Sequence, residues 1–193
     1  MAITPEQIKT LRERTGLSVM DCKNALEQAS GDMEQAVLVL RKKSSAAAAK
    51  KSERAFGAGV VQAYVHSSKD VGTIVLLSCE TDFVAKNEEF VALARDIAMH
   101  ATATAPLCIS RTEMQEEDIA RAQKLFEQEA ADKPDDKREA IIAGKMDSYY
   151  KERVLLEQEY IKDPKTTIQG LVEAATQKFG ERIEVSECKR IAV

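Results

Sequence analysis

The sequence predicts an α+β protein in which a small three-helix bundle is joined by a basic linker to a larger mixed domain. Residues 1–43 contain three short helical patterns separated by turn residues, which predicts the bundle. Residues 44–56 are rich in Ala, Lys and Ser, a composition typical of exposed tethers. Residues 57–193 combine strand patterns at both ends with helical patterns between them, which predicts an α+β core domain with a three-stranded antiparallel sheet packed by helices.

The boundaries of the N-terminal helices follow from local capping signals. Thr4 followed by Pro5 is typical of a helix start, and Gly16 is a helix stop. Ser18 is a good N-cap for a second helix. The Ser-Gly-Asp sequence at residues 30–32 ends that helix and allows a third to begin. About 40 residues provide only a thin core, so the bundle is small but feasible.

The larger domain begins with two strand patterns, at residues 59–66 and 72–79. The turn-rich segment between them predicts an antiparallel hairpin. Four later segments have apolar residues at helical spacing. In the last segment of the chain, apolar and polar residues alternate as they do in a strand. The predicted helices cover residues 87–103, 115–131, 135–157 and 167–178, and the predicted final strand covers 182–193.

Composition excludes several classes of protein. The net charge of −4 does not favour a polyanion-binding protein. The absence of an apolar run of membrane-spanning length, together with an N-terminus that does not resemble a secretory signal, predicts a cytoplasmic protein that does not bind membranes. The cysteines are widely spaced and form no Cys-x-x-Cys motif, so we expect reduced thiols and no metal site. They are Cys22, Cys79, Cys108 and Cys188.

No catalytic set is visible in the sequence. The two histidines, His66 and His100, are too few for most acid–base or metal designs. Gly57 and Gly59 begin like a dinucleotide fingerprint, but the third glycine is missing and the pair precedes a strand. We therefore expect no enzyme activity and no cofactor. The basic segment at residues 41–54 lacks interleaved aromatic residues, so we expect a solvated tether and no direct nucleic-acid binding.

The most informative segment is residues 78–87, which follows a predicted strand and precedes a predicted helix. Phe83 lies there between Asp82 and Val84, at the expected tip of a loop. One interpretation is that Phe83 folds back onto its own core while Thr81 or Asp82 caps the next helix. The other is that Phe83 projects and inserts into a partner protein, where its burial would stabilise a complex.

Three segments resemble the translation elongation factor Ts family, in the expected order and over nearly the whole chain. The first is Leu-Arg-Glu-Arg-Thr-Gly-Leu-Ser-Val-Met-Asp-Cys-Lys-Asn-Ala-Leu at residues 11–26. The second is Thr-Asp-Phe-Val-Ala-Lys at residues 81–86, and the third is residues 144–164. Leu76 and Ser78 stand where the family usually has Glu and Asn. The chain is similar to the short-form members, which implies a homodimer.

The resemblance implies a guanine nucleotide exchange factor for elongation factor Tu, a GTPase of translation. It implies that the N-terminal bundle is similar to a ubiquitin-associated domain and docks on the nucleotide-binding domain of the GTPase. It also implies that a loop of the core domain enters near the Mg²⁺ and phosphate site and promotes GDP release. The implied contacts are Leu11, Val19 and Met20 in the bundle and Thr81, Asp82, Phe83 and Val84 in the loop.

Two other functions remain open on the residues alone. The bundle could recognise ubiquitin-fold proteins or peptides as an adaptor, which would leave Asp82 and Phe83 without a role. Alternatively, the basic segment at residues 41–54 could bind ribosomal or other RNA, which predicts binding with a steep dependence on salt concentration.

Overall fold

The computed structural model describes residues 3–132 and 134–193, which divide into two compact units. The first unit contains the described residues up to Gln62 together with Leu76–Ala94 and Gln169–Ser186. The second contains Ala63–Val75, Arg95–Ile168 and Glu187–Val193. Within the described residues, no helix is long and apolar enough to cross a membrane.

The first unit begins with three helices whose starts lie where the caps predicted them. They are α1 (Pro5–Thr15), α2 (Val19–Gln28) and α3 (Met33–Ala49). Thr4 and Gln7 form a reciprocal capping box at α1, and Ser18 accepts the backbone N–H of Asp21 at α2. Gly16 ends α1 with φ +69°, a conformation that favours glycine. The likeness of this bundle to a ubiquitin-associated domain stays a prediction.

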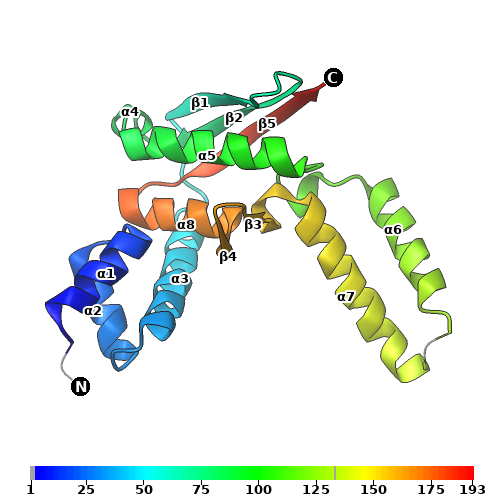
Figure 1. Ribbon diagram of the computed structural model, residues 1–193, viewed down its shortest axis with the longest axis horizontal. Coiled ribbons are helices and arrows are strands. Elements are labelled where there is room, and N and C mark those ends of the chain that lie inside the picture. The colour runs from blue at the N-terminus through cyan, green and yellow to red at the C-terminus, as the bar shows by residue number, and fades with distance from the viewer. Residues whose placement is uncertain (1–2, 133) are drawn as a thin grey trace. The chain divides into compact units, whose positions relative to one another are not determined.

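The third helix continues beyond residue 43 into the segment predicted as a linker. Its alanine run keeps the backbone helical as far as Ala49 because Ala has the highest helix propensity. Buried Ser44 donates to the side-chain oxygen of Gln177, and Ser45 donates to the Glu173 carboxylate. Both acceptors lie on α8 (Ile168–Phe179), which the upper end of α3 reaches in Figure 1. Residues 44–49 are therefore helical and are held to α8 through Ser44 and Ser45, although Ser45, Ala46 and Ala49 are exposed.

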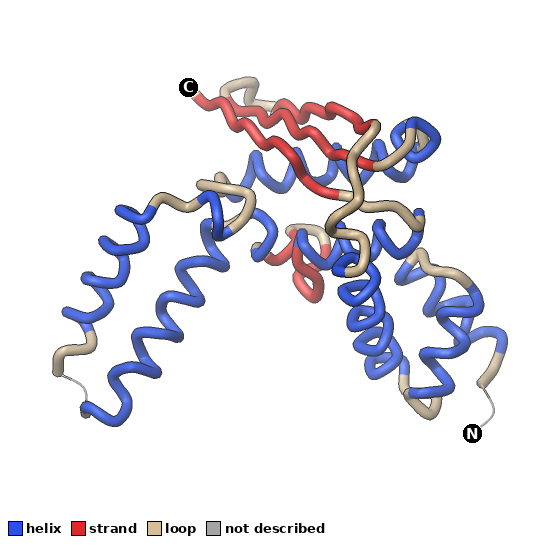
Figure 2. The backbone as a smooth tube through the Cα atoms, turned by 180° about the vertical axis from the view of Figure 1, so that it is seen from behind, coloured by secondary structure: helices blue, strands red, loops and turns tan. Residues whose placement is uncertain are grey.

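The three predicted strands form one sheet in the order β1-β2-β5, seen in red in Figure 2. They are β1 (Ala58–Val65), β2 (Val71–Cys79) and β5 (Glu184–Ala192). His66 N–H donates to Val71 C=O at the hairpin end, and Val193 N–H donates to Asp70 C=O, both at 2.9 Å. These bonds fit the antiparallel arrangement predicted from the sequence.

Two glycines allow β1 to approach β2 closely at the start of the hairpin. A Cβ atom added at Gly57 would lie 2.6 Å from the carbonyl oxygen of Glu80, and one at Gly59 would lie 2.8 Å from that of Leu77. Both distances are shorter than real Cβ contacts. The glycine pair therefore has a structural reason that is unrelated to nucleotide binding.

Helix α5 (Glu88–Thr104) contacts one face of the sheet, and the other face is partly bare. Thr102 of α5 donates to Thr73 of β2 at 2.9 Å, and both side chains are buried. On the outward side of the second unit, Val65, Ile74 and Ile191 are exposed. Alternate residues of β1 are exposed, as expected for a strand with one covered face.

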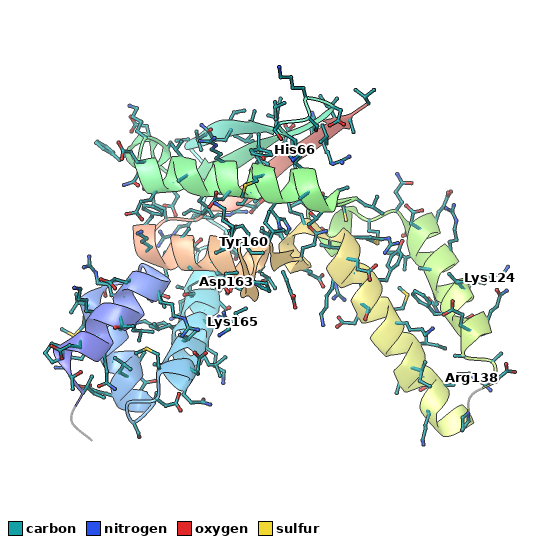
Figure 3. All side chains as sticks on the ribbon, in the orientation of Figure 1. His66, Lys124, Arg138, Tyr160, Asp163 and Lys165 are labelled. Carbon is teal, nitrogen blue, oxygen red and sulfur yellow. The ribbon has the colours of Figure 1, made fainter. Side chains whose placement is uncertain are left out.

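The rest of the second unit is a helical hairpin followed by a short ribbon. The hairpin consists of α6 (Glu116–Glu129) and α7 (Asp135–Arg153), with Lys124 and Arg138 labelled on its two helices in Figure 3. Helix α7 ends before the predicted residue 157, because Val154 has an extended backbone and forms a bridge with Cys108. Single 3₁₀ turns lie at Arg111–Glu113 and Leu155–Glu157.

The short ribbon pairs β3 (Glu159–Tyr160) with β4 (Asp163–Thr167) antiparallel, with the turn at residues 161–162. The Tyr160 side chain is buried, and its hydroxyl donates to Asp96 of α5 at 2.8 Å. Burial and this carboxylate raise the pKa of Tyr160 well above its usual range. Tyr160 is thus a structural residue of the second unit.

Candidate functional site

The Phe83 ring lies in solvent on a very short helix between β2 and α5. This helix, α4, covers only Asp82–Ala85. The side chain of Phe83 is 84% exposed, the largest exposed fraction among the exposed phenylalanine, leucine, isoleucine and methionine side chains of the described chain. The ring of Phe83 therefore does not fold back onto the core of its own chain, which was one of the two interpretations of the sequence. It projects into solvent.

The residues beside Phe83 differ in how available they are to a partner. Asp82 is exposed and its carboxylate accepts a 2.7 Å ion-pair bond from Lys86 one helical turn later. That hydrogen bond lowers the pKa of Asp82 below its usual value, so the carboxylate is charged at neutral pH. Val84 is only half-exposed. The projecting part of the loop is therefore one aromatic ring and one carboxylate.

The entry to α4 is held by a carboxylate from a distant part of the sequence. Thr81 is the N-cap residue, but its hydroxyl makes no cap bond to the helix. Instead, the Thr81 hydroxyl donates to Oε1 of Glu181 at 2.5 Å. Oε2 of the same carboxylate accepts the backbone N–H groups of Glu80 and Thr81, at 3.1 and 3.0 Å.

A second carboxylate makes the reverse connection. Oε1 of Glu80 accepts the backbone N–H of Arg182 at 2.5 Å and pairs with the Arg54 guanidinium at 3.2 Å. The bond from Arg182, followed by Arg54, lowers the pKa of Glu80. We call Glu80 and Glu181, with the groups that they bind, the crossed carboxylates. They join the β2–α4 loop to the turn between α8 and β5.

Sequence reasoning missed this supporting arrangement. Arg54 was assigned to the tether, yet it binds Glu80 and its carbonyl accepts a 2.7 Å bond from Arg182. The Arg182 guanidinium also lies 4.1 Å from the centre of the Phe56 ring. Glu181 lies 100 residues after Thr81, so no local pattern signals the contact. The only sequence signal is the helix-ending Gly180, whose φ of +75° turns the chain toward the loop.

The three bundle residues implied as partner contacts are placed differently. Leu11 is fully buried in the core of the bundle, because it lies on the inward face of α1. Its side chain is not available to a partner in this conformation. Val19 and Met20 at the start of α2 are 55% and 63% exposed. Of the three implied residues, Val19 and Met20 are the ones that lie on the outside of the bundle.

The other chemistry-bearing residues do not gather into a second site. In residues 3–132 and 134–193, no group of three or more His, Cys, Asp or Glu side chains could hold a metal ion. His66 is exposed at the hairpin turn and its Nδ1 lies 2.8 Å from the hydroxyl of Ser68 (Figure 3). His100 is fully buried and contacts Gln158 through Nε2 at 2.9 Å.

Comparison with known proteins decides the family. A family model described as "Elongation factor TS" matches residues 6–193. The chain is 47% identical over 197 residues to elongation factor Ts of Leptospira biflexa serovar Patoc, with 100% of this chain and 98% of that protein covered. It is 44% identical over 195 residues to elongation factor Ts of Herpetosiphon aurantiacus, again with 100% and 98% covered.

The chain belongs to the elongation factor Ts family. The match to the Fervidobacterium nodosum elongation factor Ts, 41% identical with 100% of this chain and 99% of that protein covered, supports the same assignment. The family that residues 11–26 and 81–86 indicated in the sequence is thereby confirmed. Membership in the elongation factor Ts family identifies the chain as a nucleotide exchange factor of translation.

Proposed function

We propose that this chain binds elongation factor Tu with its GDP and promotes GDP release by inserting the Asp82–Phe83 tip near the Mg²⁺ and phosphate site. The observation that carries the proposal is the bare Phe83 ring on a tethered helix. A ring left in water loses the stabilisation that burial provides, about 1.5–3 kcal/mol for a large apolar side chain. A partner that buries the ring recovers this free energy, as interface hot spots do.

The free energy available from one ring is of the size that exchange requires. A factor that prefers the nucleotide-free GTPase to the loaded one lowers nucleotide affinity by the same ratio. A hundredfold effect corresponds to a coupling of about 2.7 kcal/mol. The ring and a few hydrogen bonds supply that much. The Asp82 carboxylate would compete with the phosphates for the backbone N–H donors or cations that bind them. No covalent step is involved.

The N-terminal bundle would hold the GTPase while the loop acts. Val19 and Met20 provide an exposed apolar contact whose positions match the family's first motif. We exclude Leu11 from this contact because it is already buried in the bundle. Packing of Ser44 and Ser45 against α8 supports a bundle that is attached at a defined distance from the loop, since both belong to the first unit.

A second copy of the chain is the proposed occupant of the bare sheet face. Val65, Ile74 and Ile191 are exposed apolar residues of the second unit, one on each strand of the sheet, and would together give this unit an apolar surface. Burying such a surface against an identical one would remove it from water. Sedimentation of the protein at micromolar concentration tests this. Ile191→Lys should convert a dimer to a monomer, and a monomeric unmodified protein would contradict the proposal.

The alternatives from sequence have less support. Arg54 and Lys43 of the basic segment are paired with Glu80 and Asp21, so part of its charge is used within the protein. An adaptor that uses only the bundle leaves the exposed Phe83 unexplained. No observation favours either alternative.

Stopped-flow release of a fluorescent GDP analogue from elongation factor Tu tests the proposal. Phe83→Ala should lower the maximal release rate at least about tenfold, equivalent to roughly 1.4 kcal/mol. Leu125→Ala is the matched control, because Leu125 is also an exposed apolar residue but lies on α6. Equal rates for Phe83→Ala and the unmodified protein would contradict the proposed insertion.

A further inference from the structure

We propose that Glu181 is a positioning residue for nucleotide exchange, which orients the Phe83 ring by holding the backbone that enters α4. This inference rests on the proposed insertion of Phe83. Glu181 does not reach the ring itself. It acts through Thr81 and the backbone N–H of Glu80.

The Phe83 ring lies mostly in solvent. Phe83 is 84% exposed, so packing does not determine where it points. Its direction follows from the backbone of α4, which has only four residues. A helix this short is far below the roughly 12–15 residues at which an isolated helix becomes marginally stable. The loop therefore depends on external bonds for a defined conformation.

Glu181 supplies those bonds at the point where α4 begins. Its carboxylate accepts three hydrogen bonds, from the hydroxyl and N–H of Thr81 and from the N–H of Glu80. The carbonyl of Thr81 accepts two bonds of 3.2 Å, one from the thiol of Cys79 and one from the N–H of Ala85 within α4. The local helix contributes few bonds of its own, including Lys86 N–H to Asp82 C=O at 3.1 Å.

The end of α8, which lies just before Glu181 in the sequence, is itself packed against a neighbouring helix. Phe179 at the end of α8 makes an edge-to-face contact with buried Phe90 of α5, with ring centres 6.0 Å apart. Gly180 turns the chain directly after Phe179, and the next residue is Glu181. The return bond from Arg182 N–H to Glu80 closes the connection. The end of α8 is thus connected to the loop through the Glu181 carboxylate.

The alternative is that Glu181 only stabilises the fold. The two roles differ in what a loss of Glu181 does once Phe83 has been removed. A positioning residue has nothing left to orient in the Phe83→Ala protein, whereas a stabilising residue still has its effect. A double-mutant cycle therefore separates them.

The test measures the maximal rate and the half-saturating factor concentration for GDP release. Glu181→Ala should lower the maximal rate about tenfold and change half-saturation less than threefold, since Val19 and Met20 are unaffected. Adding Glu181→Ala to Phe83→Ala should lower the rate by less than twofold further. Glu181→Gln, which has one acceptor oxygen in place of two, should fall between the unmodified protein and Glu181→Ala.

Matched variants provide the controls. Glu184→Ala removes a carboxylate that binds the Arg182 side chain but none of the loop, and it should exchange normally. Thr81→Val should be slower than the unmodified protein, because it removes the hydroxyl that donates to Glu181. Normal exchange by both Glu181→Ala and Glu181→Gln, with Phe83→Ala impaired, would overturn this inference alone. Normal exchange by Phe83→Ala would overturn the proposed function and the inference together.

If Glu181→Ala does not fold, the cycle is run with Glu181→Gln and Thr81→Val. Additive losses in the cycle, or a loss in half-saturation alone, would assign Glu181 a purely structural role.

Discussion

Replacing Met20 with Ala should weaken docking on elongation factor Tu without slowing exchange at saturation. Full burial of a methionine is worth about 1.5–3 kcal/mol. Because Met20 is 63% exposed in the free protein, roughly two thirds of this free energy is still to be gained on docking. Truncation to Ala should remove about 1 kcal/mol of it, which weakens binding roughly fivefold. Val19→Ala should cost less, because Val is smaller and 55% exposed.

Titration calorimetry with GDP-loaded elongation factor Tu measures the docking affinity, and the stopped-flow assay measures the maximal rate. Leu38→Ala is the matched control, since Leu38 is an exposed apolar residue on α3 of the same bundle. All three variants should unfold at the temperature of the unmodified protein. Unchanged affinity in Met20→Ala would refute the docking role. A fall in maximal rate as large as that of Phe83→Ala would show that the bundle acts at the nucleotide site.

Three further predictions concern stability and reactivity. Leu26→Ala should reduce the free energy of unfolding in urea by about 2–5 kcal/mol, because Leu26 is fully buried in the small bundle core. Burial lowers the pKa of His100 below 6.5, so the folded protein binds fewer protons than the unfolded chain. Its stability contribution is complete above pH 6.5 and is lost as the pH falls. The thermal midpoint should thus drop between pH 7 and pH 5, and His100→Gln should lessen the drop. Burial raises the pKa of Cys188 to about 11, which leaves roughly one thiol in a thousand ionised at pH 8. Alkylation of Cys188 by iodoacetamide should accordingly be much slower than that of a fully exposed thiol, and a rate equal to that of glutathione would contradict the raised pKa.

Features set by neighbouring residues could be predicted from sequence. The caps at Thr4, Ser18 and Asp32 lie next to the helices that they begin, so the pattern alone locates them. The β1–β2 hairpin is similarly local. The unusual position of Phe83 between Asp82 and Val84, at the expected tip of a loop, indicated a candidate site, and the family resemblance assigned it a use.

Features that depend on distant residues could not be predicted. Whether α3 would stop at residue 43 or continue depended on α8, which offers Glu173 and Gln177 as partners for Ser45 and Ser44. The bonds of Glu181 to the loop span 100 residues. Leu11 matched a contact position of the family, yet its inward place on α1 became evident only when the bundle was assembled.

The close approach of β1 to β2 at Gly57 has a consequence for evolution and engineering. A methyl group there would meet the carbonyl oxygen of Glu80, whose carboxylate and N–H both belong to the crossed carboxylates. Even a Gly57→Ala change would therefore displace the anchor of the loop that we propose acts in exchange. In a deep mutational scan, this inconspicuous glycine should tolerate about as few replacements as Phe83 itself.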